Sequence, residues 1–150
     1  MIGRLQRNKV KYVVPTCTLI HSVDSLPLAE EIARRAADAG AAATCLLEVN
    51  VAGEDQKGGA GPDDAVRLAG QVAALDGVRL AGLMTMAPLV DDPEAARPVF
   101  AGLRELRERI NREAALPRPL EDLSMGMTQD YEVAVEEGAT IVRIGSALFA

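Results

Sequence analysis

Short apolar runs recur along the chain, separated by longer segments in which apolar residues return every three or four positions. The runs lie at residues 18–23, 44–51, 78–86, 120–124 and 140–144, and turn-forming residues bound each of them. Near-continuous apolar runs of this length predict strands that are buried on both faces, as in a parallel sheet. A shorter apolar piece at residues 2–5 counts as a further fragment, which gives about six strands.

The segments between these strands have the spacing of amphipathic helices. They predict helices at residues 25–40, 63–75, 92–114 and 128–137, the last with Thr128 as its N-cap. Pro98 conflicts with a continuous third helix, so we expect the regular part of that helix to begin there or to kink.

Strands that alternate with helices indicate an α/β chain with a parallel sheet. An open, doubly wound sheet would fit about six strands. A closed (β/α)₈ barrel usually takes about 250 residues, and this chain has 150. Six strands would, however, be the last three quarters of a small barrel, so both architectures remain open from the pattern.

Composition and charge narrow the possible partners. Apolar residues make up 49% of the chain and charged residues 25%, which suits a single globular domain. The net charge of −6 argues against a nucleic acid or an anionic membrane surface as partner. No apolar run approaches the roughly 18 residues of a membrane helix, and Cys17 and Cys45 have neither metal-ligand nor disulfide-framework spacing. We therefore expect a cytoplasmic protein with reduced thiols.

The candidate chemistry lies at the ends of the last two strands. Ser124-Met-Gly126 and Gly145-Ser146 each follow an apolar run and combine a glycine with a hydroxyl. At the ends of neighbouring strands, such loops can present backbone N–H groups and hydroxyls to one anion. The sequence therefore predicts a phosphate site at these two loops.

Arg143 precedes the second loop by two residues. A two-residue period places it on the same face as Ile141 and Gly145, and so inside a barrel, where an unpaired charge is costly. Two interpretations remain open: a structural ion pair with a carboxylate such as Glu48, or a donor to a ligand.

Other reactive residues carry weaker signals. His21 is expected to be a satisfied, half-buried histidine, and Ser124 is not expected to be a nucleophile because no histidine lies near it in sequence and G-x-S-x-G is absent. Lys57, in a glycine-rich loop, is the nearest candidate for a lysine that bonds a carbonyl group, although a solvated loop lysine is the favoured interpretation.

Residues 1–9, Met-Ile-Gly-Arg-Leu-Gln-Arg-Asn-Lys, resemble the W-H-[FM]-I-G-x-L-Q-x-N-K signature of the pyridoxal phosphate homeostasis protein family, relatives of the N-terminal barrel of alanine racemase. The family's later motifs follow in order over the whole chain: Ile20-His-Ser-Val-Asp24, Glu48-Val-Asn50 with Lys57-Gly-Gly59, Gly82-Leu-Met84, Leu123-Ser-Met-Gly-Met127 with Asp130, and Val142-Arg-Ile-Gly-Ser-Ala-Leu-Phe149.

The resemblance implies a partial (β/α)₈ TIM-type barrel with about the last six of eight strands, forming one incomplete domain over residues 1–150. It implies that the chain binds pyridoxal phosphate (PLP) and holds no metal, with Arg143 facing the pyridine nitrogen. Members bind and buffer this cofactor without an established enzymatic activity, so we expect no catalytic residues. The implied cofactor-binding residues are Ser124, Gly126, Met127, Arg143, Gly145 and Ser146.

In the family, the lysine that bonds the cofactor lies upstream of the signature with which this chain begins. The resemblance therefore implies an N-terminal truncation and weak, non-covalent cofactor binding. Either the true start lies upstream and Met1 is an internal methionine, or the chain is a genuine remnant. Barrel edges left open would favour self-association. Two other functions remain open: a racemase-like enzyme acting on a PLP-bound or phosphate-bearing substrate, and a truncated fragment that binds nothing.

Overall fold

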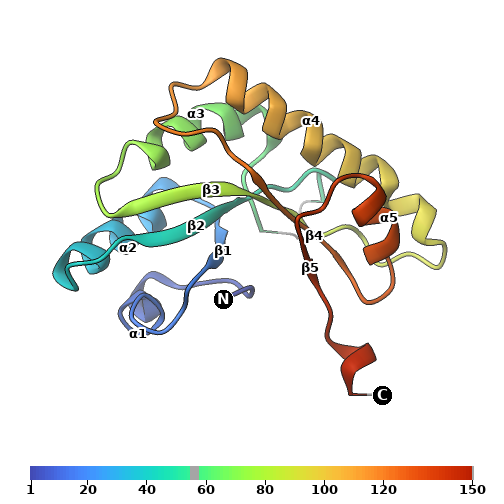
Figure 1. Ribbon diagram of the computed structural model, residues 1–150, viewed down its shortest axis with the longest axis horizontal. Helices are drawn as coiled ribbons and strands as arrows, with labels where there is room; N and C mark the ends of the chain where they lie inside the picture. Colours follow the sequence, from blue (N-terminus) through green and yellow to red (C-terminus); the bar gives the residue numbers. More distant parts are fainter. Residues whose placement is uncertain (55–57, 150) are drawn as a thin grey trace.

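Five parallel strands form a single sheet in the order β1-β2-β3-β4-β5 (Figure 1). The computed structural model describes residues 1–54 and 58–149. The strands are β1 (Ile20–Val23), β2 (Ala43–Glu48), β3 (Val78–Met84), β4 (Asp122–Met127) and β5 (Ile141–Arg143). The helices are α1 (Val10–Val13), α2 (Leu26–Asp38), α3 (Pro62–Ala73), α4 (Arg97–Glu113) and α5 (Tyr131–Glu136), with 3₁₀ turns η1 (Arg7–Lys9), η2 (Pro93–Ala96) and η3 (Ser146–Leu148).

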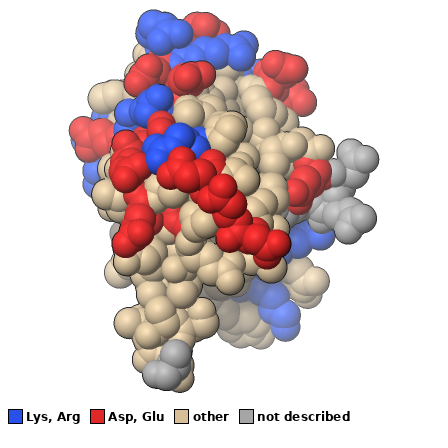
Figure 2. Space-filling view, turned by 90° about the vertical axis from the view of Figure 1, so that its right-hand side faces the viewer, with Lys and Arg blue, Asp and Glu red and all other residues tan. Residues whose placement is uncertain are grey.

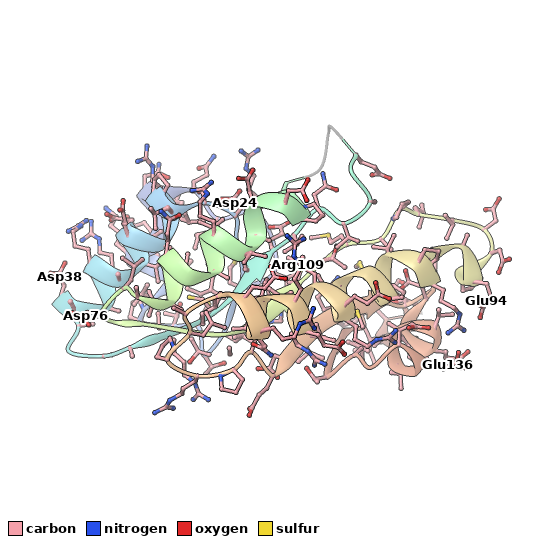
Figure 3. The ribbon with its side chains drawn as sticks, turned by 90° about the horizontal axis from the view of Figure 1, so that it is seen from above. Asp24, Asp38, Asp76, Glu94, Arg109 and Glu136 are labelled. Carbon is pink, nitrogen blue, oxygen red and sulfur yellow. The ribbon has the colours of Figure 1, made fainter. Side chains whose placement is uncertain are left out.

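Each strand pairs with the next one along the chain, and the connecting helices cover the same face of the sheet. Figure 1 shows α3 and α4 above the sheet, and Figure 3, seen from above, shows α2, α3 and α4 side by side. A doubly wound sheet would reverse its strand order and carry helices on both faces. The fold is therefore a partial TIM-type barrel, which confirms that prediction and removes the doubly wound alternative.

The hydrophobic core lies between this face and the helices. Leu47, Leu83 and Leu123, on three adjacent strands, belong to one buried cluster with Phe100 and other helix residues. Leu46 and Met84 are equally buried but lie outside that cluster. Because side chains alternate along a strand, these two residues face the inner side of the barrel.

The strand count differs from the expected six. Residues 2–5 form no strand, although the segment lies beside β1: the Met1 carbonyl accepts a hydrogen bond from the His21 N–H (2.9 Å), and the Met1 ammonium group donates to the Leu19 carbonyl (2.8 Å). Two hydrogen bonds at one end do not make a ladder, so the segment borders β1 without extending the sheet.

Two expectations for the helices had different outcomes. The third predicted helix divides into η2 and then α4, which begins at Arg97, so Pro98 lies in the first turn, where no backbone N–H is needed. The expected N-cap at Thr128 was wrong. Asp130 precedes α5, and its carboxylate accepts a hydrogen bond from the Met127 N–H (2.6 Å), so the turn after β4 is longer than expected.

Within the described residues, none of the helices is both long enough and apolar enough to span a membrane.

Candidate functional site

A cavity of about 570 Å³ lies at the carboxyl ends of β3, β4 and β5. It is the part of a parallel α/β sheet where ligands bind, because loops from neighbouring strands converge there. Three segments line it: residues 86–90 after β3, residues 126–130 at the end of β4 and just beyond it, and residues 143–146 at the end of β5. The volume falls within the range of small-molecule sites, which is about 300–1,000 Å³.

Five of the six residues predicted to bind the cofactor line this cavity: Gly126, Met127, Arg143, Gly145 and Ser146. Ser124 does not. Its side chain is fully buried, and its hydroxyl lies among other side chains on the inner side of the barrel. Ser124 therefore lies behind the cavity lining, and its contact with a bound phosphate stays a prediction.

Gly126 allows β4 to turn toward α5 at the cavity wall. Its φ of +90° lies in the left-handed region, and a Cβ atom would lie 2.6 Å from the Ala134 Cβ and 3.0 Å from the Tyr131 Cα. Only glycine combines this backbone conformation with so close an approach. The loop that follows bends back to the end of β5, where the Thr128 hydroxyl accepts a hydrogen bond from the Gly145 N–H (3.3 Å).

Ion pairs hold the cavity wall beside α4. Arg97 contacts Glu94, Glu136 and Glu137, and so connects η2 and α5 to the start of α4. Figure 3 shows Glu94 and Glu136 at the same end of the molecule, and Figure 2, which faces that end, shows acidic and basic side chains interleaved. Partly exposed pairs add about 0–1 kcal/mol each to stability, so their main effect is on where these elements lie.

Arg143 is the buried cation of the cavity. Its Nη1 donates to the Ser124 hydroxyl (2.8 Å) and its Nη2 to the Thr85 carbonyl (2.9 Å). Its Nε–H is buried and has no hydrogen-bond partner among the described residues. An unpaired buried donor is costly, so this atom is a natural contact for a ligand acceptor.

The two interpretations of Arg143 can now be compared. In the described part of the chain, Arg143 forms no salt bridge, with Glu48 or any other carboxylate. Burial lowers the pKa of the Arg143 guanidinium, and the charges of Asp130 and Glu48 act in the opposite direction. A guanidinium remains protonated under these conditions because it ionises far above neutral pH. The geometry favours a donor to a ligand.

His21 joins this network from β1, the strand at the opposite edge of the sheet from β5. Its Nδ1 lies 2.9 Å from the Ser124 Oγ, so the ring has a partner as expected, but it is buried and not half-buried. Burial, together with the charges of the N-terminal ammonium group and Arg143, lowers the pKa of His21 to about 4, so the ring is neutral at pH 7. A histidine beside a serine is also the arrangement of a base and a nucleophile, but this hydroxyl does not line the cavity and accepts a hydrogen bond from Arg143.

Burial also raises the pKa of Glu48, on the inner face of β2. The nearby charge of Asp24 acts in the same direction, and those of Arg143 and Arg4 oppose it. Glu48 lies outside the main cavity, beside a smaller one of about 200 Å³.

The two described lysines lie away from this cavity. Lys9 and Lys11 are exposed near α1, beside the ring of Tyr12. Lys57, the candidate for a lysine that bonds a carbonyl group, lies outside the described residues. No lysine is among the residues that line the cavity in the described chain.

Sequence reasoning missed the roles of three residues. Thr128 and Asp130 were read as parts of a helix start and a motif, yet both line the cavity. Thr85 follows β3 and is fully buried, with its carbonyl holding Arg143. The signal available in the sequence was a hydroxyl or carboxylate residue directly after a strand. That signal does not reveal which groups of other strands such a residue contacts in the fold.

Comparison with known proteins adds four findings. The sequence profile described as alanine racemase, N-terminal domain, matches residues 2–150. The pyridoxal phosphate homeostasis protein of Aquifex aeolicus is 51% identical over 150 residues, which cover 99% of this chain and 64% of that protein. PipY of Synechococcus elongatus, solved with PLP bound, gives a TM-score of 0.87 at 35% identity, covering 99% of this chain and 68% of that one.

A crystal structure of an unknown protein from Bifidobacterium adolescentis is also similar. It gives a TM-score of 0.92 at 46% identity and covers 99% of this chain and 59% of that one. The half-barrel and its profile match place the chain in the alanine racemase N-terminal domain family. Within that family it belongs to the pyridoxal phosphate homeostasis proteins. The chain spans less than two thirds of the length of the Aquifex relative, whose name states no catalytic activity.

Proposed function

We propose that these 150 residues bind pyridoxal phosphate in the cavity at the ends of β3, β4 and β5, and that they act in cofactor homeostasis and not as a catalyst. The observation that carries this proposal is Arg143. It is a buried cation that lines the cavity and has an Nε–H without a partner among the described residues. The PLP-bound structure of PipY supports the choice of ligand.

The cavity lining fits the two parts of this cofactor. Thr128 and Ser146 carry hydroxyls that can donate to a phosphate, and Gly126 and Gly145 leave the backbone of both loops open to close approach. The opposite wall is apolar, with Met86, Pro88 and Val90 suited to the face of an aromatic ring.

Bound PLP supplies an aldehyde carbon and a pyridine ring that can draw electrons from a substrate. In our proposal, Arg143 donates to the ring nitrogen and, being permanently charged, keeps that nitrogen unprotonated. An unprotonated ring draws electrons less strongly, which suits a carrier. Ser124 belongs to this site through its hydrogen bond to Arg143.

Catalysis would need an acid and a base at the cavity. Among the described residues that line it, Asp130 is the only carboxylate, and one of its oxygens already accepts the Met127 N–H. The absence of lysine from the described lining supports weak, non-covalent binding.

The proposal is tested by titrating the chain with PLP and reducing a parallel sample with borohydride before peptide mapping. We expect weak, saturable binding of one equivalent and no stoichiometric lysine adduct. Arg143→Met should weaken binding, whereas Arg109→Met, at a partly exposed position of α4 that does not line the cavity, should not. Binding that does not saturate would overturn the proposal, and a stoichiometric adduct on one lysine would overturn its non-covalent part.

A further inference from the structure

Three polar side chains meet inside the barrel from three different strands. His21 comes from β1, Ser124 from β4 and Arg143 from β5, and all three are buried. The Ser124 Oγ lies 2.8 Å from the Arg143 Nη1 and 2.9 Å from the His21 Nδ1, so the hydroxyl bridges the other two side chains.

The chemistry of these groups fixes the direction of both hydrogen bonds. A guanidinium has only donors, so the Ser124 oxygen must accept from Arg143. The serine proton then needs an acceptor, because a buried hydroxyl without one is costly. The Nδ1 of His21 is the acceptor in reach, and it can accept only when it carries no proton. The histidine proton must therefore lie on Nε2.

We propose that Ser124 and His21 are positioning residues: they hold Arg143 in place through the Ser124 hydroxyl, with His21 neutral and protonated on Nε2. This inference rests on the proposed function, because the held guanidinium is the group that would face the cofactor ring. Nη1 and Nη2 each donate one N–H, to Ser124 and to the Thr85 carbonyl, and the Nε–H has no partner among the described residues.

The surroundings of His21 favour the neutral ring. Burial is the largest cause, because it penalises a charged imidazole. The Arg143 guanidinium also disfavours a second positive charge, and the Asp122 carboxylate opposes it. A protonated ring would place an N–H against the Ser124 oxygen and leave the serine proton without its acceptor.

The first test is nitrogen NMR of the imidazole in the cofactor-free chain. His21 is the only histidine, so a long-range nitrogen–proton spectrum contains a single imidazole. We expect the Nε2–H tautomer at pH 7 in the wild type and a mixture of tautomers in Ser124→Ala. A protonated Nδ1 in the wild type would overturn the network, and this result does not depend on whether PLP binds.

The second test separates positioning of the ring contact from general damage. Ser124→Ala and His21→Leu should weaken PLP binding about tenfold, and they should leave the affinity for inorganic phosphate within twofold of the wild type. A variant that is merely less well folded would lose affinity for both ligands. His21→Asn offers an amide oxygen near the position of Nδ1, so it should restore most of the PLP affinity that His21→Leu loses.

The outcomes distinguish this inference from the proposed function. If the wild type binds PLP and all three variants bind it equally well, the positioning role is wrong while the proposed function stands. If the wild type does not bind PLP, the proposed function fails, and the tautomer alone decides whether the network exists. Circular dichroism on each variant identifies any that does not fold, and the His21→Asn and His21→Leu pair then replaces Ser124→Ala.

Discussion

The Nδ1 of His21 lies 2.9 Å from the Oγ of Ser124, although two strands separate β1 from β4 in the sheet. Neighbouring strands lie about 4.8 Å apart, so a flat sheet would hold these two strands about 14 Å apart. The contact is possible because the sheet curves as a barrel does. Curvature therefore brings a residue from the first strand to the arginine of the last one.

Stability should depend on His21 in mildly acidic solution. Its folded-state pKa of about 4 lies below the ordinary histidine value of 6.5, so the unfolded chain takes up this proton first as the pH falls. The contribution of the neutral ring to stability is fully present well above pH 6.5 and is lost as the pH falls toward 4. At pH 5 the loss in the free energy of unfolding is about 2 kcal/mol. Urea unfolding at pH 7.5 and pH 5 measures the change. His21→Asn should show a smaller loss, and an equal loss in both proteins would contradict the assignment.

Gly82→Ala should disrupt the pairing of β3 with β4. A Cβ at this position would lie 2.0 Å from the Asp122 carbonyl oxygen and 2.6 Å from its carbon, and backbone atoms of a paired strand cannot move aside. We expect a loss of about 3 kcal/mol or more in the free energy of unfolding. Gly70→Ala is the matched control, because it adds a methyl group to α3 with nothing within 4 Å and should stabilise the helix by up to about 1 kcal/mol. Similar effects of the two changes would contradict this account of β3.

Local sequence signals predict part of the fold and the site, and contacts between distant strands account for the rest. The strands after residue 18 and the loops at Gly126 and Gly145 were predictable, because apolar runs and glycines leave local signals. The role of Ser124 was not, since the local pattern placed it with the glycines while its partners come from β1 and β5. Thr128 was misread for a related reason: Gly126 at a positive φ extends the turn and delays the helix to Tyr131.

The two cysteines should differ sharply in reactivity. Cys45 is fully buried, and burial raises the pKa of its thiol to about 12. Cys17 is partly exposed. Since the thiolate is the reactive form, a thiol-specific chromogenic reagent should modify Cys17 in the native chain and Cys45 only after unfolding. Rapid modification of both thiols in the native state would contradict the packing of β2.

Self-association should involve the sheet edge at β5. Met1 borders β1 through its hydrogen bond with His21, whereas the other end of the sheet carries exposed apolar side chains at Val142 (36% exposed), Leu148 (69%) and Phe149 (90%). The C-terminal segment with η3 projects at the lower end of the molecule (Figure 1), and Figure 2 shows no charged side chains on the visible face of that end. Sedimentation equilibrium should detect concentration-dependent association that Phe149→Glu weakens and Tyr12→Glu, near α1, does not. A wild type that remains monomeric at high concentration would contradict this expectation.

The central claim is that PLP binds at the loops after β4 and β5, and a backbone amide NMR titration tests it most directly. Adding PLP should shift the amide signals of Gly126, Met127, Gly145 and Ser146, which line the cavity, and leave those of Gly40 and Gly77, at the opposite ends of the strands, unchanged. Arg143→Met should reduce the shifts at any given PLP concentration. Shifts confined to the exposed Lys9 and Lys11, with none at the cavity glycines, would contradict the claim.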